Sequence, residues 1–243
     1  MKFNLSELSF FNLYVKDNDW FPLQNHGLID KEIKLQKEDS DFPNQITTYL
    51  NLFKNIDINN LSVLDIGCGW GRGPHKIKKY FKNSDVTGMD INFLFIDFAK
   101  SNFKNCKYIQ DDLFETKINN NSFDFIVSNC SMHFFYDQDV IYKNIKNILK
   151  PKGKLLITDI WNSKSFLTFL DKCKQHNFKI LSIEDLTNPT IEAIERDIEE
   201  VLPKFIDKVS SKSIDAFLEI QKERLTFFRH NINRQYKFIV QIR

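Results

Sequence analysis

The chain has 243 residues, of which 42% are hydrophobic and 27% are charged, and its formal net charge is +2. This length suits one domain with a sizeable core and is too short for two full-sized domains joined by a linker. The totals lack the basic excess of a nucleic-acid-binding protein, and no segment approaches the roughly 20 apolar residues of a membrane span. We therefore expect neither nucleic acid nor a membrane among its partners.

The cysteines give no sign of a disulfide framework or a metal site. Cys68, Cys106, Cys130 and Cys173 are scattered and form no close pair. The amino-terminal stretch is interrupted by charged residues and lacks the apolar run of a signal peptide. We expect reduced thiols and a cytoplasmic location.

Residues 1–57 show helical periodicity and no alternating strand pattern. The clearest helix begins at Pro43, a residue favoured in the first turn, and continues with Ile46, Tyr49 and Leu50 at helical spacing. We expect this region to form a helical lid over the remainder of the chain.

Strands and helices then alternate over residues 58–186. The predicted strands are 61–66, 85–91, 106–110, 123–128, 154–159 and 178–186, and the predicted helices are 75–82, 93–102, 140–149 and 166–176. Such alternation is typical of an α/β protein with a mostly parallel sheet and helices on both faces. The pattern predicts a core that belongs to one domain, residues 1–243.

Two further helices precede a final strand. The first predicted helix has Pro189 in its first turn and extends to residue 202, and the second covers 211–229. Residues 236–242 have the pattern of a β-strand. We expect a helical cap at 188–230 and a last strand at 235–243.

A glycine-rich loop, Asp65-Ile-Gly67-Cys-Gly69-Trp-Gly71, follows the first predicted strand and precedes a helix. Glycine permits positive φ and close approach of a ligand, and the following helix offers free N–H groups. The glycine spacing differs from the dinucleotide pattern, which disfavours a nicotinamide oxidoreductase. No Gly-Lys-Ser or Gly-Lys-Thr follows, which excludes a Walker-type nucleotide loop. An acid at the start of the loop suits a ligand ammonium better than a pyrophosphate. The alternative is a turn that serves chain geometry alone.

Three acids follow the next strands. Asp90 lies about 20 residues past the glycines, where a carboxylate accepts ribose hydroxyls. Asp111 and Asp112 end the third strand; we favour Asp112 as the acceptor for an adenine amino group, with the Leu113 amide facing the ring. The alternatives are an ordinary loop acid at position 90 and a solvated acidic turn at 111–112.

Together these segments resemble the class I methyltransferases, which use S-adenosylmethionine. Residues 63–71 resemble their first motif, 88–91 the second and 110–113 the adenine-binding segment. Residues 122–127 match the fourth strand, and 149–156 match the helix-to-strand corner before the fifth strand. The resemblance covers about residues 60–160. It implies a seven-stranded, mostly parallel sheet whose last strand is antiparallel, and a cap that closes an acceptor pocket.

The resemblance also indicates which residues would contact S-adenosylmethionine. The expected cofactor-binding residues are Asp65, Gly67, Cys68, Gly69, Trp70, Gly71, Asp90, Ile91, Asp111, Asp112, Leu113 and Asn129.

The acceptor is expected to be a small, apolar or natural-product-like molecule. Ser128-Asn-Cys-Ser131 replaces the Asn/Asp-Pro-Pro-Tyr motif of DNA-adenine methyltransferases, which argues against a flipped base. His133 and Tyr136 are the catalytic candidates, because they follow the fourth strand; His133 is the candidate base, with a structural or donor-positioning role as the alternative.

Aromatic and acidic residues elsewhere offer further hypotheses. Phe134, Phe135 and Trp161 would line the pocket or form core, and Trp20 and His26 would belong to the lid. No metal site is expected, although Asp159 with Asp185 is one hypothetical pair. The open alternatives are a methyltransferase acting on protein or RNA and a non-catalytic cofactor-binding subunit; the sequence does not predict the oligomeric state or the methylated atom.

Overall fold

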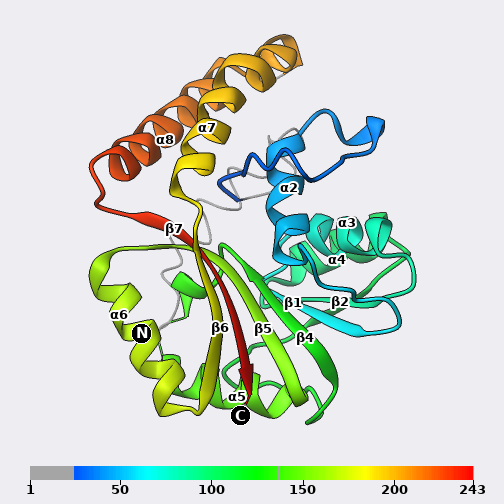
Figure 1. The fold of residues 1–243 in the computed structure, drawn as a ribbon. Coiled ribbons are helices and arrows are strands. Elements are labelled where there is room, and N and C mark those ends of the chain that lie inside the picture. Colours follow the sequence, from blue (N-terminus) through cyan, green and yellow to red (C-terminus); the bar gives the residue numbers. More distant parts are fainter. Residues whose placement is uncertain (1–24, 136, 209, 243) are drawn as a thin grey trace.

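A seven-stranded sheet forms the centre of the computed structural model, which describes residues 25–135, 137–208 and 210–242 (Figure 1). The strand order is β3-β2-β1-β4-β5-β7-β6; β1 to β5 pair in parallel, and β7 is antiparallel to both β5 and β6. The strands are β1 Ser62–Ile66, β2 Asp85–Asp90, β3 Lys107–Gln110, β4 Phe123–Asn129, β5 Leu149–Trp161, β6 Phe178–Asp185 and β7 Arg234–Ile242. The predicted fold class is confirmed.

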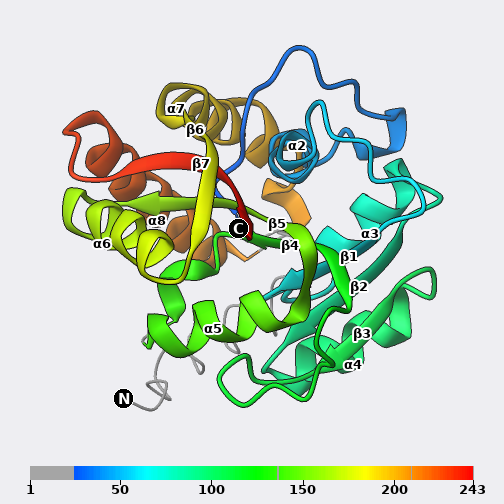
Figure 2. The same cartoon turned by 60° about the horizontal axis from the view of Figure 1, so that its bottom comes forward.

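Helices cover both faces of this sheet (Figure 2). They are α2 Pro43–Leu52, α3 Arg72–Tyr80, α4 Phe93–Asn102, α5 Gln138–Ile148, α6 Ser163–Gln175, α7 Thr187–Arg196 and α8 Ser211–Arg229. Successive strand residues point to opposite faces, so Leu64 and Ile66 of β1 pack in the cluster of α5 and α6, whereas Val63 packs with α2 and α3. Because both faces are buried, the central strands are continuous apolar runs.

Some element boundaries differ from the predictions. The segment 150–153, predicted as a corner, is part of β5, which begins at Leu149. The helix predicted to run to residue 202 ends at Arg196 and continues as a π-helix, Asp197–Val201, and a 3-10 turn, Leu202–Lys204. Pro203 lacks an N–H and its ring clashes with the carbonyl four residues before it, so a regular α-helix cannot continue through residues 199–203.

The N-terminal segment differs as well. Between residues 25 and 42 the described chain holds a single 3-10 turn, Lys37–Asp39, and not the predicted series of helices. Its backbone instead pairs with other elements: Leu28 N donates to Asn44 O at 2.9 Å and Ile29 N to Pro189 O at 3.2 Å. Trp20 lies outside the described residues. The segment therefore connects α2 to the start of α7.

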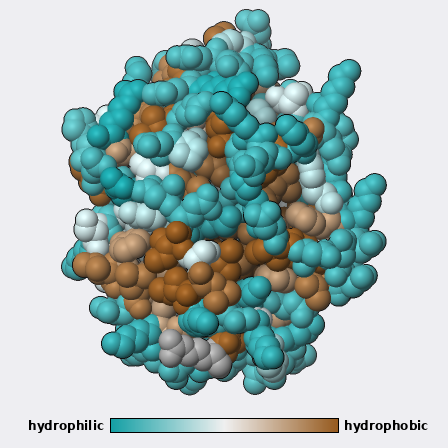
Figure 3. All heavy atoms as spheres, viewed as in Figure 1, coloured by the Kyte–Doolittle hydropathy of each residue, from teal (hydrophilic) through white to brown (hydrophobic). Residues whose placement is uncertain are grey.

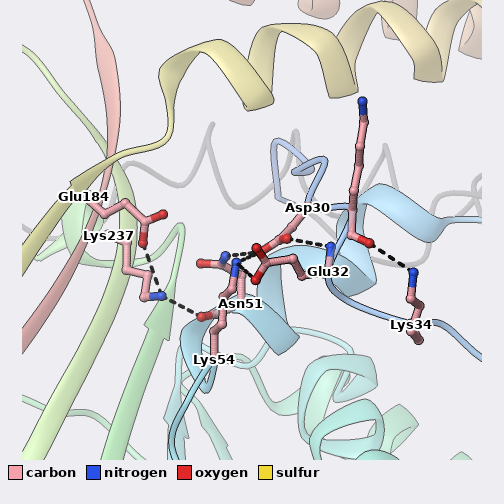
Figure 4. Close-up of polar contacts among 8 residues, drawn as sticks. Asp30, Glu32, Lys34, Asn51, Lys54, Glu184 and Lys237 are labelled. Carbon is pink, nitrogen blue, oxygen red and sulfur yellow. Dashed lines mark hydrogen bonds and ion pairs between the residues drawn. The ribbon is translucent and has the colours of Figure 1, made fainter.

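A polar network joins the N-terminal segment, α2 and the sheet (Figure 4). Lys237 of β7, although almost fully buried, donates to Asn51 O at 2.7 Å and pairs with Glu184 of β6 at 3.4 Å. The amide of Asn51 and the amine of Lys54 both donate to Asp30, at 3.0 and 2.9 Å. These charge-assisted contacts fix the segment against the sheet.

The cap stands over the edge of the sheet where β5 and β6 end (Figure 1). Asp197 of the π-helix is buried and accepts hydrogen bonds from Asn44 and Gln45 of α2. Burial raises the pKa of Asp197 to about 6, against the opposing effect of the two amide donors. This carboxyl therefore joins the cap to the N-terminal helix in a water-poor environment.

The outer surface combines a polar shell with an apolar band. On the face drawn in Figure 3, apolar side chains gather across the part of the sheet formed by β4 to β7. Leu181 and Ile183 of the edge strand β6 are 41% and 45% exposed. Within the described residues, no helix is long and apolar enough to cross a membrane.

Replacing Asp197 with Asn is expected to change how stability depends on pH. The folded protein holds the Asp197 proton more tightly than the unfolded chain, so its stabilising effect is complete below the ordinary pKa of 3.8 and is lost as pH rises through about 6. Relative to Asp197→Asn, the wild type should lose roughly 3 kcal/mol of unfolding free energy as the pH rises from below about 3 to above about 7.

Urea unfolding across that pH range measures the difference. Asp207→Asn, a change at an exposed carboxylate of the cap, is the matched control and should follow the wild type. A difference between wild type and Asp197→Asn that stays constant with pH would contradict the interpretation.

Candidate active site

The glycine loop lies at the C-terminal end of β1, where the strand order changes direction between β1 and β4. In open α/β sheets, ligands bind at this position. Gly67, Gly69 and Gly71 all have positive φ, of 70°, 53° and 76°. A Cβ at Gly67 would come within 2.7 Å of Ser131, whereas one at Gly69 would meet nothing within 4 Å. The loop thus packs at Gly67 on the segment that follows β4 and leaves open space at Gly69.

Asp65 is a fully buried carboxylate beside this open space. Neither of its oxygens has a partner at hydrogen-bond geometry. Burial raises the pKa of Asp65 well above its ordinary value, the nearby Asp90 adds to this, and the Tyr49 hydroxyl opposes it. An unpaired buried acid of this kind fits a ligand that brings a cation, such as an amino-acid ammonium.

Tyr49 is a residue that sequence reasoning assigned only to a helix face. Its ring lies on Gly73, where an added Cβ would come within 2.2 Å of it. Its hydroxyl faces Asp65 from α2. The contact could not be inferred from the sequence, because it joins residues from two elements that are separated along the chain.

Asp90 ties the end of β2 to the loop. Its Oδ2 accepts from Gly69 N at 2.9 Å and its Oδ1 accepts from Asn92 N at 2.9 Å. Burial raises the pKa of Asp90, and the backbone amides act in the opposite direction. Each carboxylate oxygen can accept a second hydrogen bond, so the pair remains able to bind two hydroxyls. Ile91, next in the chain, is 44% exposed and flanks this position.

Asp111 and Asp112 have different surroundings. The carboxylate of Asp111 accepts from Thr116 Oγ1 at 2.7 Å and from Lys117 N at 3.0 Å, so it stabilises its own turn. Asp112 uses one oxygen, at 2.9 Å from Phe114 N. Leu113 is buried. This arrangement favours Asp112 over Asp111 as the acceptor of a hydrogen bond from a ligand amino group. That Asp111 and Asp112 bind the cofactor stays a prediction.

The other predicted cofactor residues fall into two groups. Asn129, at the end of β4, is buried with both side-chain polar atoms unpartnered, as expected of a group that awaits a ligand. Trp70 packs on Phe95 and Phe98 of α4, with ring centroids 4.4 and 5.1 Å away. Burial raises the pKa of the Cys68 thiol, which keeps it neutral and makes it a packing residue.

His133 forms a close pair with Asp159 at the same edge of the sheet. Its Nδ1 lies 2.7 Å from Asp159 Oδ1, and the fully buried carboxylate also accepts from the amides of His133 and Ile160 at 3.2 and 2.8 Å. The histidine ring is 35% exposed. Tyr136, the second catalytic candidate, lies outside the described residues.

Three further sequence hypotheses can be compared with these positions. Trp161 is core, because its ring packs on Phe169 and Phe238. Phe134 lies over the His133 ring at 4.0 Å and remains a candidate pocket residue. The Asp159 and Asp185 carboxylates have separate partners, since Asp185 pairs with Arg234; in the described part of the chain no cluster of metal-ligating side chains is found.

Comparison with known proteins identifies the class. The model of a methyltransferase domain family matches residues 57–200, more than half of the chain. The chain therefore belongs to this family, and it is an S-adenosylmethionine-dependent methyltransferase. The unpaired Asp65 and Asn129, the open space at Gly69 and the carboxylate of Asp90 fit that cofactor.

Individual relatives are distant. A phthiotriol/phenolphthiotriol dimycocerosates methyltransferase of Mycobacterium ulcerans is 22% identical, over 82% of this chain and 84% of its own length. A fatty-acid O-methyltransferase of Mycolicibacterium smegmatis is 27% identical over 60% of this chain, and the match spans only 54% of that protein. Among solved structures, geranyl diphosphate C-methyltransferase of Streptomyces coelicolor superposes with a TM-score of 0.69 at 14% identity, covering 90% of this chain and 87% of the other.

Replacing Asp90 with Asn should weaken the binding of S-adenosylhomocysteine by about 10- to 100-fold. The side chain then carries no charge, and an NH2 group that donates hydrogen bonds replaces one of the two oxygens that accept them from hydroxyls. Isothermal titration calorimetry measures the dissociation constant. Asp85→Asn is the control, since Asp85 lies at the opposite, exposed end of the same strand and pairs with Lys107. Equal affinities for all three proteins would remove Asp90 from the site.

Proposed function

We propose that this methyltransferase modifies a small-molecule acceptor bound between the cap and the C-terminal edge of the sheet, with His133 as the base. The observation behind the proposal is the His133–Asp159 pair at that edge.

The four free thiols agree with a reducing, cytoplasmic setting.

The apolar character of the cap supports a small acceptor of low polarity. Ile194, Leu225 and Phe228 form a buried cluster in which Ile160, directly after Asp159, also packs. The relatives named above act on a phthiotriol dimycocerosate, a fatty acid and geranyl diphosphate, each of which has a large apolar part.

Asp159 determines which nitrogen of His133 is available. With Nδ1–H donating to the carboxylate, Nε2 carries a lone pair and can accept a proton. Asp159 itself is held by two backbone amides, so the ring orientation is fixed before the acceptor binds. Asp159 is thus a positioning residue and His133 the group that would touch the acceptor.

The cofactor supplies a methyl group on a positively charged sulfur. The residues around Asp65, Asp90 and Asp112 would hold its amino-acid, ribose and adenine parts, so that only the acceptor has to be oriented. Placing the acceptor atom about 3 Å from the methyl carbon provides much of the rate enhancement, and proton removal by a base contributes about 10²- to 10⁴-fold.

The acceptor class can be tested with isotope-labelled S-adenosylmethionine. Purified protein is incubated separately with a small-molecule extract, a protein extract and total RNA, and the label is then followed into each fraction. We expect label in the small-molecule fraction. Label in protein or RNA would overturn the proposal, and no transfer to any fraction would favour a non-catalytic cofactor-binding subunit.

His133→Ala and Asp159→Asn should each lower kcat by about 10²- to 10³-fold with an unchanged dissociation constant for S-adenosylhomocysteine. The chain offers a matched control pair, because His176 Nε2 and Asp139 make a similar contact of 2.8 Å on the outer surface. His176→Ala and Asp139→Asn should retain full activity. Loss of cofactor affinity in the His133 variant would instead indicate the donor-positioning role.

A further inference from the structure

A second histidine lies near the proposed acceptor site without a protein partner. His26 is only 6% exposed, yet neither of its ring nitrogens makes a hydrogen bond. Its ring contacts Phe228 of α8 edge-on, with centroids 6.0 Å apart. Buried polar atoms are nearly always paired, so the ring nitrogens of His26 call for a partner that the described residues do not provide.

The backbone around His26 is firmly held. Asn25 Nδ2 donates to Gln45 O at 3.1 Å, Gly27 N donates to Asn25 Oδ1 at 2.9 Å, and Leu28 N pairs with Asn44 O. Gly27 has a φ of 76°, and a Cβ there would lie 3.0 Å from Asn44. The orientation of the ring is therefore imposed by α2 and by contact with the cap.

His26 and the catalytic pair share one region of the molecule. The backbone amide of His26 faces the thiol of Cys130, directly after β4. Phe228, which the His26 ring contacts, packs in the same cluster as Ile160, whose amide donates to Asp159. His26 also interacts electrostatically with His133 and with Arg224 of α8.

The charges in this region distinguish between classes of acceptor. Two carboxylates of this region have hydrogen-bond partners among the described residues: Asp159 accepts from His133 and Ile160, and Asp197 accepts from Asn44 and Gln45. Both are shielded from solvent. The positive charge of Arg224 acts on His26 and favours an oxygen acid over an ammonium as the acceptor, while the imidazole of His133 can take the proton of that acid.

We propose that His26 binds the acceptor oxygen opposite His133, and that this enzyme methylates an ionisable oxygen, as in a phenol, an enol or a carboxylic acid. The inference rests on the proposed function. The acceptor O–H gives its proton to Nε2 of His133, and an oxygen lone pair forms the bond to the methyl carbon. The carbon–sulfur bond breaks with its electron pair left on sulfur, which becomes a neutral thioether.

The protonation state of His26 suits this role. Burial, together with the nearby Arg224 and His133, lowers the pKa of His26 well below its ordinary value. The ring is then neutral at physiological pH, with one N–H to donate to the oxygen.

Binding of 4-nitrophenol to the protein loaded with S-adenosylhomocysteine tests the inference, because the phenolate absorbs visible light and the phenol does not. We expect bound probe to ionise, and His26→Phe to raise its dissociation constant by about tenfold or more. His26→Asn, which keeps a donor, should recover part of the affinity. 4-Nitrobenzylamine, of similar size, should bind more weakly than the phenol.

Two further measurements separate binding from structure. Thermal unfolding of His26→Phe without probe should occur at the wild-type midpoint or above it, since the variant loses unpaired polar atoms and keeps an aromatic ring beside Phe228. His75→Phe is the control, because His75 also contacts a phenylalanine, Phe103, but on the outer side of α3; it should bind the phenol as the wild type does.

A clearly lower midpoint for His26→Phe, phenol binding unchanged in that variant, absent phenol binding, or preference for the amine would each overturn the inference. None of these outcomes affects the labelling experiment, in which transfer to the small-molecule fraction would still support the proposed function. Absence of transfer there would remove the proposed function itself.

Discussion

The site depends on a buried carboxylate beside which the described part of the chain places no cation. Asp65, the residue before the last one of β1, lies in the core; neither of its oxygens has a partner at hydrogen-bond geometry among the described residues, and its pKa is well above the ordinary value. Such a group is costly to bury in its charged form, and a ligand that brings a positive charge offsets that cost. The neighbouring loop leaves space at Gly69, and Asp90 fixes that loop through its amide. The cofactor site is therefore formed in advance, at some expense in stability.

Parallel strands explain why distant residues meet at one edge. Ile66, Asp90, Asn129 and Asp159 belong to four different strands that run in the same direction, so their carboxyl ends are adjacent. Ser131 strengthens this junction, because its hydroxyl donates to Ile66 O at 2.8 Å. The cap and the N-terminal segment then close the edge from above, through Asp197 and through the backbone bonds of residues 28 and 29. The cofactor site and the proposed acceptor site thus lie at the same edge of the sheet, and the cap and the N-terminal segment cover the acceptor side.

Local patterns in the sequence predicted the features that depend on neighbouring residues. Apolar runs indicated the strands, and the spacing of glycines after β1 indicated the loop and its ligand. Contacts between distant segments could not be predicted in the same way: Asp159 was considered as a metal ligand, whereas it orients His133. Tyr49 over the loop, the unpaired ring of His26 and the core position of Trp161 depend on how α2, α8 and α6 pack. The turn bonds of Asp111 were likewise not visible in the sequence.

Thermal unfolding with different cofactors tests the central claim most directly. A ligand that binds only the folded state adds roughly 2.7 kcal/mol at about 100 times its dissociation constant, which raises the midpoint of a protein of this size by several degrees. We predict such a rise with S-adenosylmethionine and with S-adenosylhomocysteine, and none with NADH. An unchanged midpoint with both adenosyl ligands, or an equal rise with NADH, would contradict the prediction.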